Sequence, residues 1–207
     1  MIESDYIAEV IETSTTQFFA QCLETKDLSF PIMPPFGSLV KSLDEESGNT
    51  ILAVVTYATT TSIDSVHHTR ALGLSLAELR EQQPQIFAML KTEFKATIVG
   101  FKNSFMTQDD SEVYHQYLPP RPPQIHQAVY RCQEKEIINF SKKFDFLRIL
   151  LQVKEAPVDA LIIASIRNIY LLKKSDKNWL VHIGRALGIL LKDDYDRLHY
   201  ILNQVIT

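Results

Sequence analysis

Glycine is scarce in this sequence, with six glycines among 207 residues. Neither of the common phosphate-binding loops, GxxxxGK(S/T) and GxGxxG, occurs, and both need glycines at fixed positions so that the backbone can approach a phosphate. Gly184 and Gly188 are spaced i, i+4 within a helical pattern, which is typical of close helix packing. The sequence therefore predicts neither of these phosphate-binding loops, and we expect no cofactor.

Cysteine is also rare, and the two cysteines are 110 residues apart without a CxxC motif. This spacing fits free thiols in a reducing compartment better than a disulfide framework. Cys22 lies among apolar residues and is expected to be inert. Cys132 directly precedes a helical pattern, where a helix dipole could activate a thiol slightly, but no partner base is fixed beside it, so we do not expect a nucleophile there.

Long apolar runs and a secretory leader are absent from the sequence. No uncharged apolar stretch reaches the roughly 18–20 residues that a membrane span needs. The first residues, MIESDYIAEV, are acidic where a signal peptide requires a basic start. We therefore expect a protein without a membrane segment, located in the cytoplasm.

The net charge of −4 is unevenly distributed along the chain. Residues 1–105 carry a net charge of −6, whereas residues 106–207 carry +2. This asymmetry favours a two-part chain. The excess of two positive charges is far below the basic footprint of a dedicated nucleic-acid-binding domain.

The first half of the sequence predicts short β-strands separated by turns. Residues 51–57 (ILAVVTY) give the strongest signal, because β-branched residues dominate. The predicted strands are residues 6–12, 17–23, 39–43, 51–57 and 94–101. Strands at about ten-residue spacing are typical of a barrel or sandwich. We predict a small closed barrel over residues 1–105, with a short helical insertion near residues 74–91.

The second half predicts helices after a proline-rich connector. Residues 106–128 form this connector, in which four prolines within five residues favour a stiff extended backbone. Residues 129–207 are expected to form a helical domain. Its clearest amphipathic patterns cover residues 158–172, 178–191 and 194–206, and short polar connections favour an antiparallel bundle. The predicted fold class is therefore α+β, a closed N-terminal barrel followed by a C-terminal antiparallel helical bundle.

Two groups of residues are candidates for an interaction. The first is the connector, where Pro119, Pro120, Arg121, Pro122 and Pro123 contain a PxxP pattern that an aromatic groove could read. A rigid strut between domains is the alternative interpretation of these prolines. His126 follows them, and we expect it to be a hydrogen-bonded packing residue.

The second group is a polar cluster that begins at Asp64 and ends at Arg70. His67 and His68 lie between them, but adjacent histidines on a strand point to opposite faces and would not share a metal ion. A polar loop or barrel rim is the simpler interpretation. No arrangement of a nucleophile with a base is recognisable anywhere in the sequence, and we expect neither a catalytic nor a metal site.

The strand motifs resemble the HAS barrel, a small β-barrel shared by HerA-type translocases and rotary ATP synthase subunits. The residues that carry this resemblance are 8–18 (AEVIETSTTQF), 34–40 (PPFGSLV), 53–57 (AVVTY) and 59–64 (TTTSID). The chain is similar more narrowly to stand-alone HAS-barrel proteins of unknown function from cyanobacteria, and this similarity continues through residues 118–126. Residues 65–68 (SVHH) replace the Gly-Arg-type turn of many relatives, so a basic contact at that rim does not carry over.

The resemblance implies a non-catalytic assembly element, because in the larger ATPases a separate core performs the chemistry. We therefore predict an assembly or adaptor protein that acts through protein–protein contacts, with an NTPase partner or as a homo-oligomer. One alternative is a nucleic-acid-associated accessory factor that uses the basic residues of the helical half. Another alternative is an enzyme built around the cluster at residues 64–70.

Overall fold

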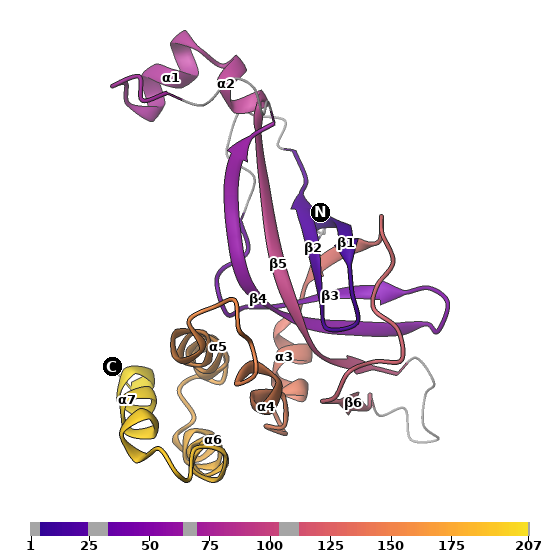
Figure 1. The fold of residues 1–207 in the computed structure, drawn as a ribbon, viewed down its shortest axis with the longest axis vertical. Coiled ribbons are helices and arrows are strands. Elements are labelled where there is room, and N and C mark those ends of the chain that lie inside the picture. The colour runs from indigo at the N-terminus through magenta and orange to yellow at the C-terminus, as the bar shows by residue number, and fades with distance from the viewer. Residues whose placement is uncertain (1–4, 25–32, 64–69, 104–111, 207) are drawn as a thin grey trace.

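The computed structural model describes residues 5–24, 33–63, 70–103 and 112–206. Within these residues, six antiparallel strands close into a barrel in the order β2-β1-β7-β3-β4-β5, and β5 pairs back with β2 (Figure 1). The seven strands are β1 (Tyr6–Thr13), β2 (Gln17–Cys22), β3 (Leu39–Asp44), β4 (Asn49–Ser62), β5 (Leu90–Lys102), β6 (Tyr114–His115) and β7 (Ala128–Arg131). The closed barrel followed by helices confirms the predicted α+β class.

Strand β7 is the part of the barrel that the sequence does not predict. It pairs with β1 on one side and with β3 on the other, so it completes the ring. Its four residues are too few for a recognisable strand pattern, and they follow the predicted connector. The structure therefore moves the predicted boundary, because the barrel ends after residue 131 and not at residue 105.

The short strand β6 pairs with the end of β5, outside the ring. Gly100 of β5 allows this close approach, since a Cβ at that position would lie 2.2 Å from the carbonyl oxygen of His115. His115 also stacks on Phe101, with ring centroids 4.8 Å apart.

Strand β4 is buried continuously from Ile51 to Thr56 because both of its faces are covered. Ile51, Ala53 and Val55 pack inside the barrel. Leu52 and Val54 face outward and belong to a second hydrophobic core that the helices complete. The uninterrupted apolar run in the sequence thus results from two layers of packing.

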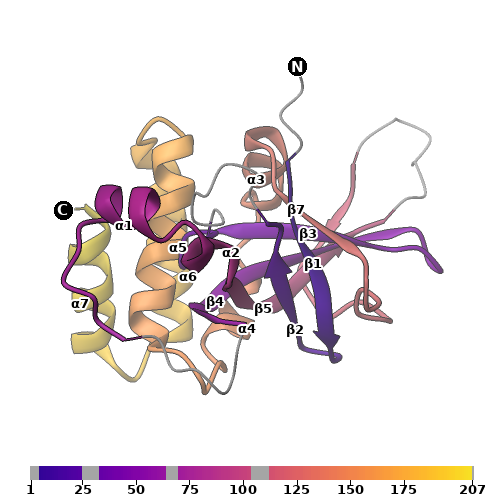
Figure 2. The ribbon, with the colours of Figure 1, turned by 90° about the horizontal axis from the view of Figure 1, so that it is seen from above.

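The helices after the barrel are α3 (Glu134–Phe140), α4 (Phe146–Leu150), α5 (Val158–Leu172), α6 (Lys177–Leu190) and α7 (Tyr195–Ile206). Helices α5, α6 and α7 lie side by side next to the barrel (Figures 1 and 2). Short turns that begin at Lys173 and Leu191 reverse the chain between them. Their buried side chains share one core with the outer faces of β3, β4 and β5, so the two parts are packed together.

Strands β4 and β5 continue beyond the barrel as a long hairpin, and their pairing extends to Ser62 and Leu90. Two short helices, α1 (Leu76–Gln82) and α2 (Gln85–Ala88), lie at its end, in the predicted helical insertion. Figure 1 shows that this end projects away from the barrel and from the C-terminal helices. We call residues 60–63 and 70–92, which lie beyond the pairing of β5 with β2, the arm.

No helix of the described segments combines the length and the apolar character that crossing a bilayer requires.

Candidate functional site: interaction surfaces of the barrel and its arm

The proline segment lies between β6 and β7, and both of these strands belong to the sheet. It therefore crosses the barrel and does not join the barrel to the helices. Arg121 forms an ion pair with Glu46 in the β3–β4 turn, and Gln124 donates a hydrogen bond of 2.7 Å to the same carboxylate. Further along, His126 contacts Glu9 of β1, with 2.5 Å between Nδ1 and Oε1.

Backbone hydrogen bonds fix the end of the same segment to β1. The N–H of His126 donates to the carbonyl of Val10, at 2.8 Å, and the N–H of Val10 donates to the carbonyl of Gln127, at 2.9 Å. His126 adopts a positive φ of 71°. The side chain of His126 is largely exposed, so its carboxylate partner and its backbone bonds hold it at the surface.

The burial of the prolines bears on the PxxP interpretation. Pro119 and Pro123 are buried, whereas Pro120 is exposed and Pro122 is half-buried. Each PxxP pair, 119 with 122 or 120 with 123, thus contains one buried proline. A partner with an aromatic groove could bind the PxxP motif only after residues 119–123 had detached from the barrel surface.

The polar cluster at residues 64–70 lies almost entirely outside the described residues. Asp64, His67 and His68 are not described, and Arg70 is exposed near the end of the arm. The structure therefore does not show whether these side chains share a face. Among the described residues, no group of three or more His, Cys, Asp or Glu side chains is arranged to hold a metal ion.

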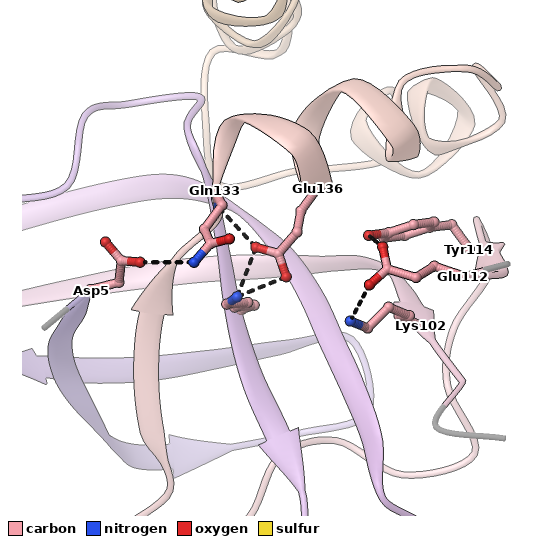
Figure 3. Close-up of polar contacts among 7 residues, drawn as sticks. Asp5, Lys102, Glu112, Tyr114, Gln133 and Glu136 are labelled. Atoms are coloured by element: carbon pink, nitrogen blue, oxygen red, sulfur yellow. Dashed lines mark hydrogen bonds and ion pairs between the residues drawn. The ribbon is translucent and has the colours of Figure 1, made fainter. Parts of the chain in front are cut away.

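A polar network at the junction of the barrel and α3 was not predicted (Figure 3). Glu136 of α3 accepts two hydrogen bonds of 2.7 Å from Nζ of Lys41, on β3, and one of 2.8 Å from the backbone N–H of Gln133. Gln133 also reaches Asp5, at 3.5 Å. The carboxylate of Glu136 is satisfied from within the protein, so its role is to hold α3 against the barrel.

A second part of the network lies at the end of β5 (Figure 3). Glu112 accepts a hydrogen bond of 2.9 Å from the hydroxyl of Tyr114 and one of 3.2 Å from Nζ of Lys102. The hydrogen bond from Tyr114 lowers the pKa of Glu112, and burial raises the pKa of Tyr114. No sequence signal predicts these contacts, because the residues belong to different elements.

Both thiols lie in environments that suppress reactivity. Burial raises the pKa of Cys22 from 9.0 to about 11. Burial also raises the pKa of Cys132, and Glu136 raises it further, although Lys41 and Lys102 lower it. This direction is opposite to activation by a helix dipole, because desolvation of the thiolate dominates.

The end of the arm exposes an unusual amount of apolar surface. Helix α1 has no buried residue, although Ser75 and Glu78 form a complete capping box at its N-terminus. The exposed fractions are 53% for Ile63, 46% for Leu72, 51% for Leu76 and 43% for Met89. Exposed apolar side chains mark interaction sites in soluble proteins where they form a contiguous patch.

Several of the predicted basic residues gather near the end of α3. Lys142 and Lys143 line a cavity of about 440 Å³ together with Lys135 and Glu112. Burial lowers the pKa of Lys173, and the nearby Lys142 lowers it further, although Asp176 acts in the opposite direction. Nζ of Lys173 also lies 5.6 Å from the ring centroid of Trp179. Arg121 is not part of this group, because it is paired with Glu46.

The closed ring of short antiparallel strands places the N-terminal part of the chain among the small β-barrels. More specifically, residues 7–102 match the model of the HAS barrel domain family. This confirms the resemblance read from the strand motifs. The match covers slightly less than half of the chain and ends before β7, and no curated protein matches the sequence. Membership of the stand-alone cyanobacterial type stays a prediction.

Proposed function

We propose that this protein is a non-catalytic assembly or adaptor protein, and that the arm is the element that contacts its partner. The partner is a second copy of the chain or an NTPase. The raised pKa values of both thiols support a non-catalytic role, because neither cysteine is suited to act as a nucleophile. Neither cysteine forms a disulfide bond, which also supports a reducing compartment such as the cytoplasm.

The projection of the arm is the observation that carries this proposal. The barrel and the C-terminal helices have buried cores, whereas helix α1 at the end of the arm has no buried residue. Burying a side chain such as Leu76 contributes about 1.5–3 kcal/mol. A partner surface that covers several of these residues would therefore gain enough free energy for specific association.

Shortening of the arm tests the proposal. Ser62 and Leu90 are cross-strand partners, so a two-residue Asn-Gly turn can replace residues 63–89 without disturbing the register. The full chain and the shortened chain are compared by light scattering after size exclusion, and by affinity purification with mass spectrometry. We expect the full chain to form an oligomer or to retain a partner, and the shortened chain to lose it.

Point variants give the matched control for this experiment. The double variant Leu72→Ser and Leu76→Ser removes apolar surface from the arm, whereas Ile189→Ser removes a comparably exposed apolar side chain from α6. Only the arm variant is expected to lose association. A full chain that is monomeric and retains nothing, or an arm variant that associates as well as Ile189→Ser, contradicts the proposal.

The basic group near α3 supports a second candidate function, binding of nucleic acid as an accessory factor. Lys142 and Lys143 line one cavity, and Lys142 lies close enough to Lys173 to affect its pKa, which gives a cluster of cations suited to contacts with phosphates. Fluorescence anisotropy with labelled single-stranded and duplex oligonucleotides tests this function. Binding that weakens steeply with salt, and that is lost in the variant Lys142→Gln, Lys143→Gln, Lys173→Gln, supports it, whereas no binding at low salt removes it.

A further inference from the structure

A cavity of about 360 Å³ lies where β2, β4 and β5 meet α4 and the turn that follows it. Hydroxyl and amide groups from both parts of the protein line it, among them Thr16, Gln17, Thr97 and Gln152. Lys95 of β5 and Lys154 of the turn supply two positive charges, and Glu155 supplies a negative charge. The volume falls in the range of small-molecule sites.

Lys95 is an unusual residue to find in the wall of a barrel. Its side chain is only 8% exposed, and Nζ lies 5.2 Å from the ring centroid of Phe19. Among the described residues, Glu155 is the only carboxylate that forms an ion pair with it. A buried ammonium group needs such a partner, because an unpaired charge in the protein interior is costly.

The backbone beside Lys95 is irregular. The register between β4 and β5 shifts between Val55 and Tyr57, and Thr56 lies at the shift. The hydroxyl of Thr56 donates a hydrogen bond of 3.3 Å to the carbonyl of Lys95. Bulges of this type often lie next to functional sites, where they direct a side chain. Here the bulge accompanies the lysine that faces the cavity.

We propose that this cavity binds a small organic anion, whose carboxylate or phosphate group replaces Glu155 as the partner of Lys95. The two members of the ion pair differ strongly in burial, because the side chain of Glu155 is 68% exposed and lies on a turn. The carboxylate of Glu155 is therefore already largely solvated and can be displaced by another anion. An incoming anion that pairs with Lys95 as Glu155 leaves keeps the buried charge compensated.

The surrounding groups favour an anion over a cation or a neutral ligand. Once Glu155 has moved, Lys95 and Lys154 leave the cavity with two positive charges. The hydroxyl of Thr97 and the amides of Gln17 and Gln152 supply additional donors for anionic oxygens. Leu118, Ile149 and Val153 provide an apolar wall for the rest of the molecule.

Titration of the full chain with sodium phosphate and, separately, with sodium acetate tests the proposal, with sodium chloride keeping the ionic strength constant. Binding is followed by the backbone amide NMR signals of the cavity residues. We expect saturable shifts, and the anion that binds more tightly identifies the preferred head group. In Glu155→Gln, which removes the competing carboxylate, the affinity should rise about tenfold.

The variant Lys95→Met removes the proposed anchor, and saturable binding should disappear. Lys91→Met is the matched control, because Lys91 lies on the same strand but pairs with Glu93 outside the cavity. If Lys95→Met does not fold, the comparison of the wild type with Glu155→Gln tests the proposal by itself. Residue 155 is mostly exposed, so this substitution should leave the fold intact. Equal affinity in the wild type and Glu155→Gln, or shifts that never saturate, would overturn the proposal.

Discussion

Gly37 lies directly against Ala164, where the first residues before β3 meet helix α5. A Cβ at Gly37 would come within 2.7 Å of Cβ of Ala164 and 2.8 Å of the backbone nitrogen of Ser165. The φ angle of Gly37 is 76°, in the region that only glycine adopts easily. This single position therefore fixes how closely the barrel and the helices approach one another.

Gly37→Ala is expected to destabilise the protein by about 2–5 kcal/mol. Left-handed backbone strain contributes about 1–2 kcal/mol, and the overlap with α5 contributes about 1–3 kcal/mol. Gly73→Ala is the matched control, because Gly73 has a φ of 70° and no neighbouring atom within 4 Å. Urea unfolding measures both variants. Equal effects at the two glycines would show that the contact with Ala164 is unimportant.

The sequence predicts this barrel well where the strands are long and apolar. The run at residues 51–57 lies where the pattern places it, because local propensity and burial agree there. Strand β7 could not be predicted in the same way. It is only four residues long, and its place depends on unpaired edges of β1 and β3 that are distant in sequence.

The ion pair between Lys41 and Glu136 is expected to stabilise the junction between the barrel and α3. Both side chains are mostly buried, with exposed fractions of 19% and 12%. Lys41→Met should lower the free energy of unfolding by about 2 kcal/mol, because it leaves the carboxylate poorly compensated. A double-mutant cycle with Glu136→Leu, measured by urea unfolding, should give a coupling energy of about 1–3 kcal/mol. Additive effects of the two substitutions would contradict this role.

Polar contacts of this kind explain why the candidate sites could be predicted only in part. The proline segment is recognisable because its composition is local. The pairs Lys41–Glu136 and Lys95–Glu155 join residues 95 and 60 positions apart, and neither member stands out among the charged residues of the sequence. Only the path of the chain around the barrel brings the members of each pair together.

The prolines of the connector should differ in their contribution to stability. Pro119 and Pro123 are buried against the barrel, whereas Pro120 is exposed. We expect Pro119→Ala and Pro123→Ala each to cost about 1–3 kcal/mol, from lost packing and from greater freedom of the unfolded chain. Pro120→Ala should cost less than about 1 kcal/mol, and thermal unfolding monitored by circular dichroism ranks the three. If Pro120→Ala proved the most costly, the segment would not pack on the barrel as described.

The buried thiol of Cys22 should make the protein sensitive to alkaline conditions. Its pKa in the folded state is about 11, above the ordinary value of 9.0, because burial disfavours the thiolate. A group whose pKa rises on folding contributes stability that is fully present below its unfolded pKa and is lost as the pH rises. The free energy of unfolding should therefore fall between pH 9 and pH 11.

Urea unfolding at half-unit steps from pH 8 to pH 11 measures this dependence. In Cys22→Ala the free energy of unfolding should depend less on pH between pH 9 and pH 11, because the titrating thiol is absent. The smaller alanine side chain should lower the free energy of unfolding at every pH. Tyr114 supplies an internal comparison, because burial and the hydrogen bond to Glu112 raise its pKa too, and Tyr114→Phe should flatten the curve only above about pH 10. Native Cys22 should also react with Ellman's reagent at pH 8 far more slowly than in the unfolded chain. Rapid reaction of the folded protein, or a curve that Cys22→Ala leaves unchanged, would show that this thiol is accessible and that the barrel interior at β2 opens readily.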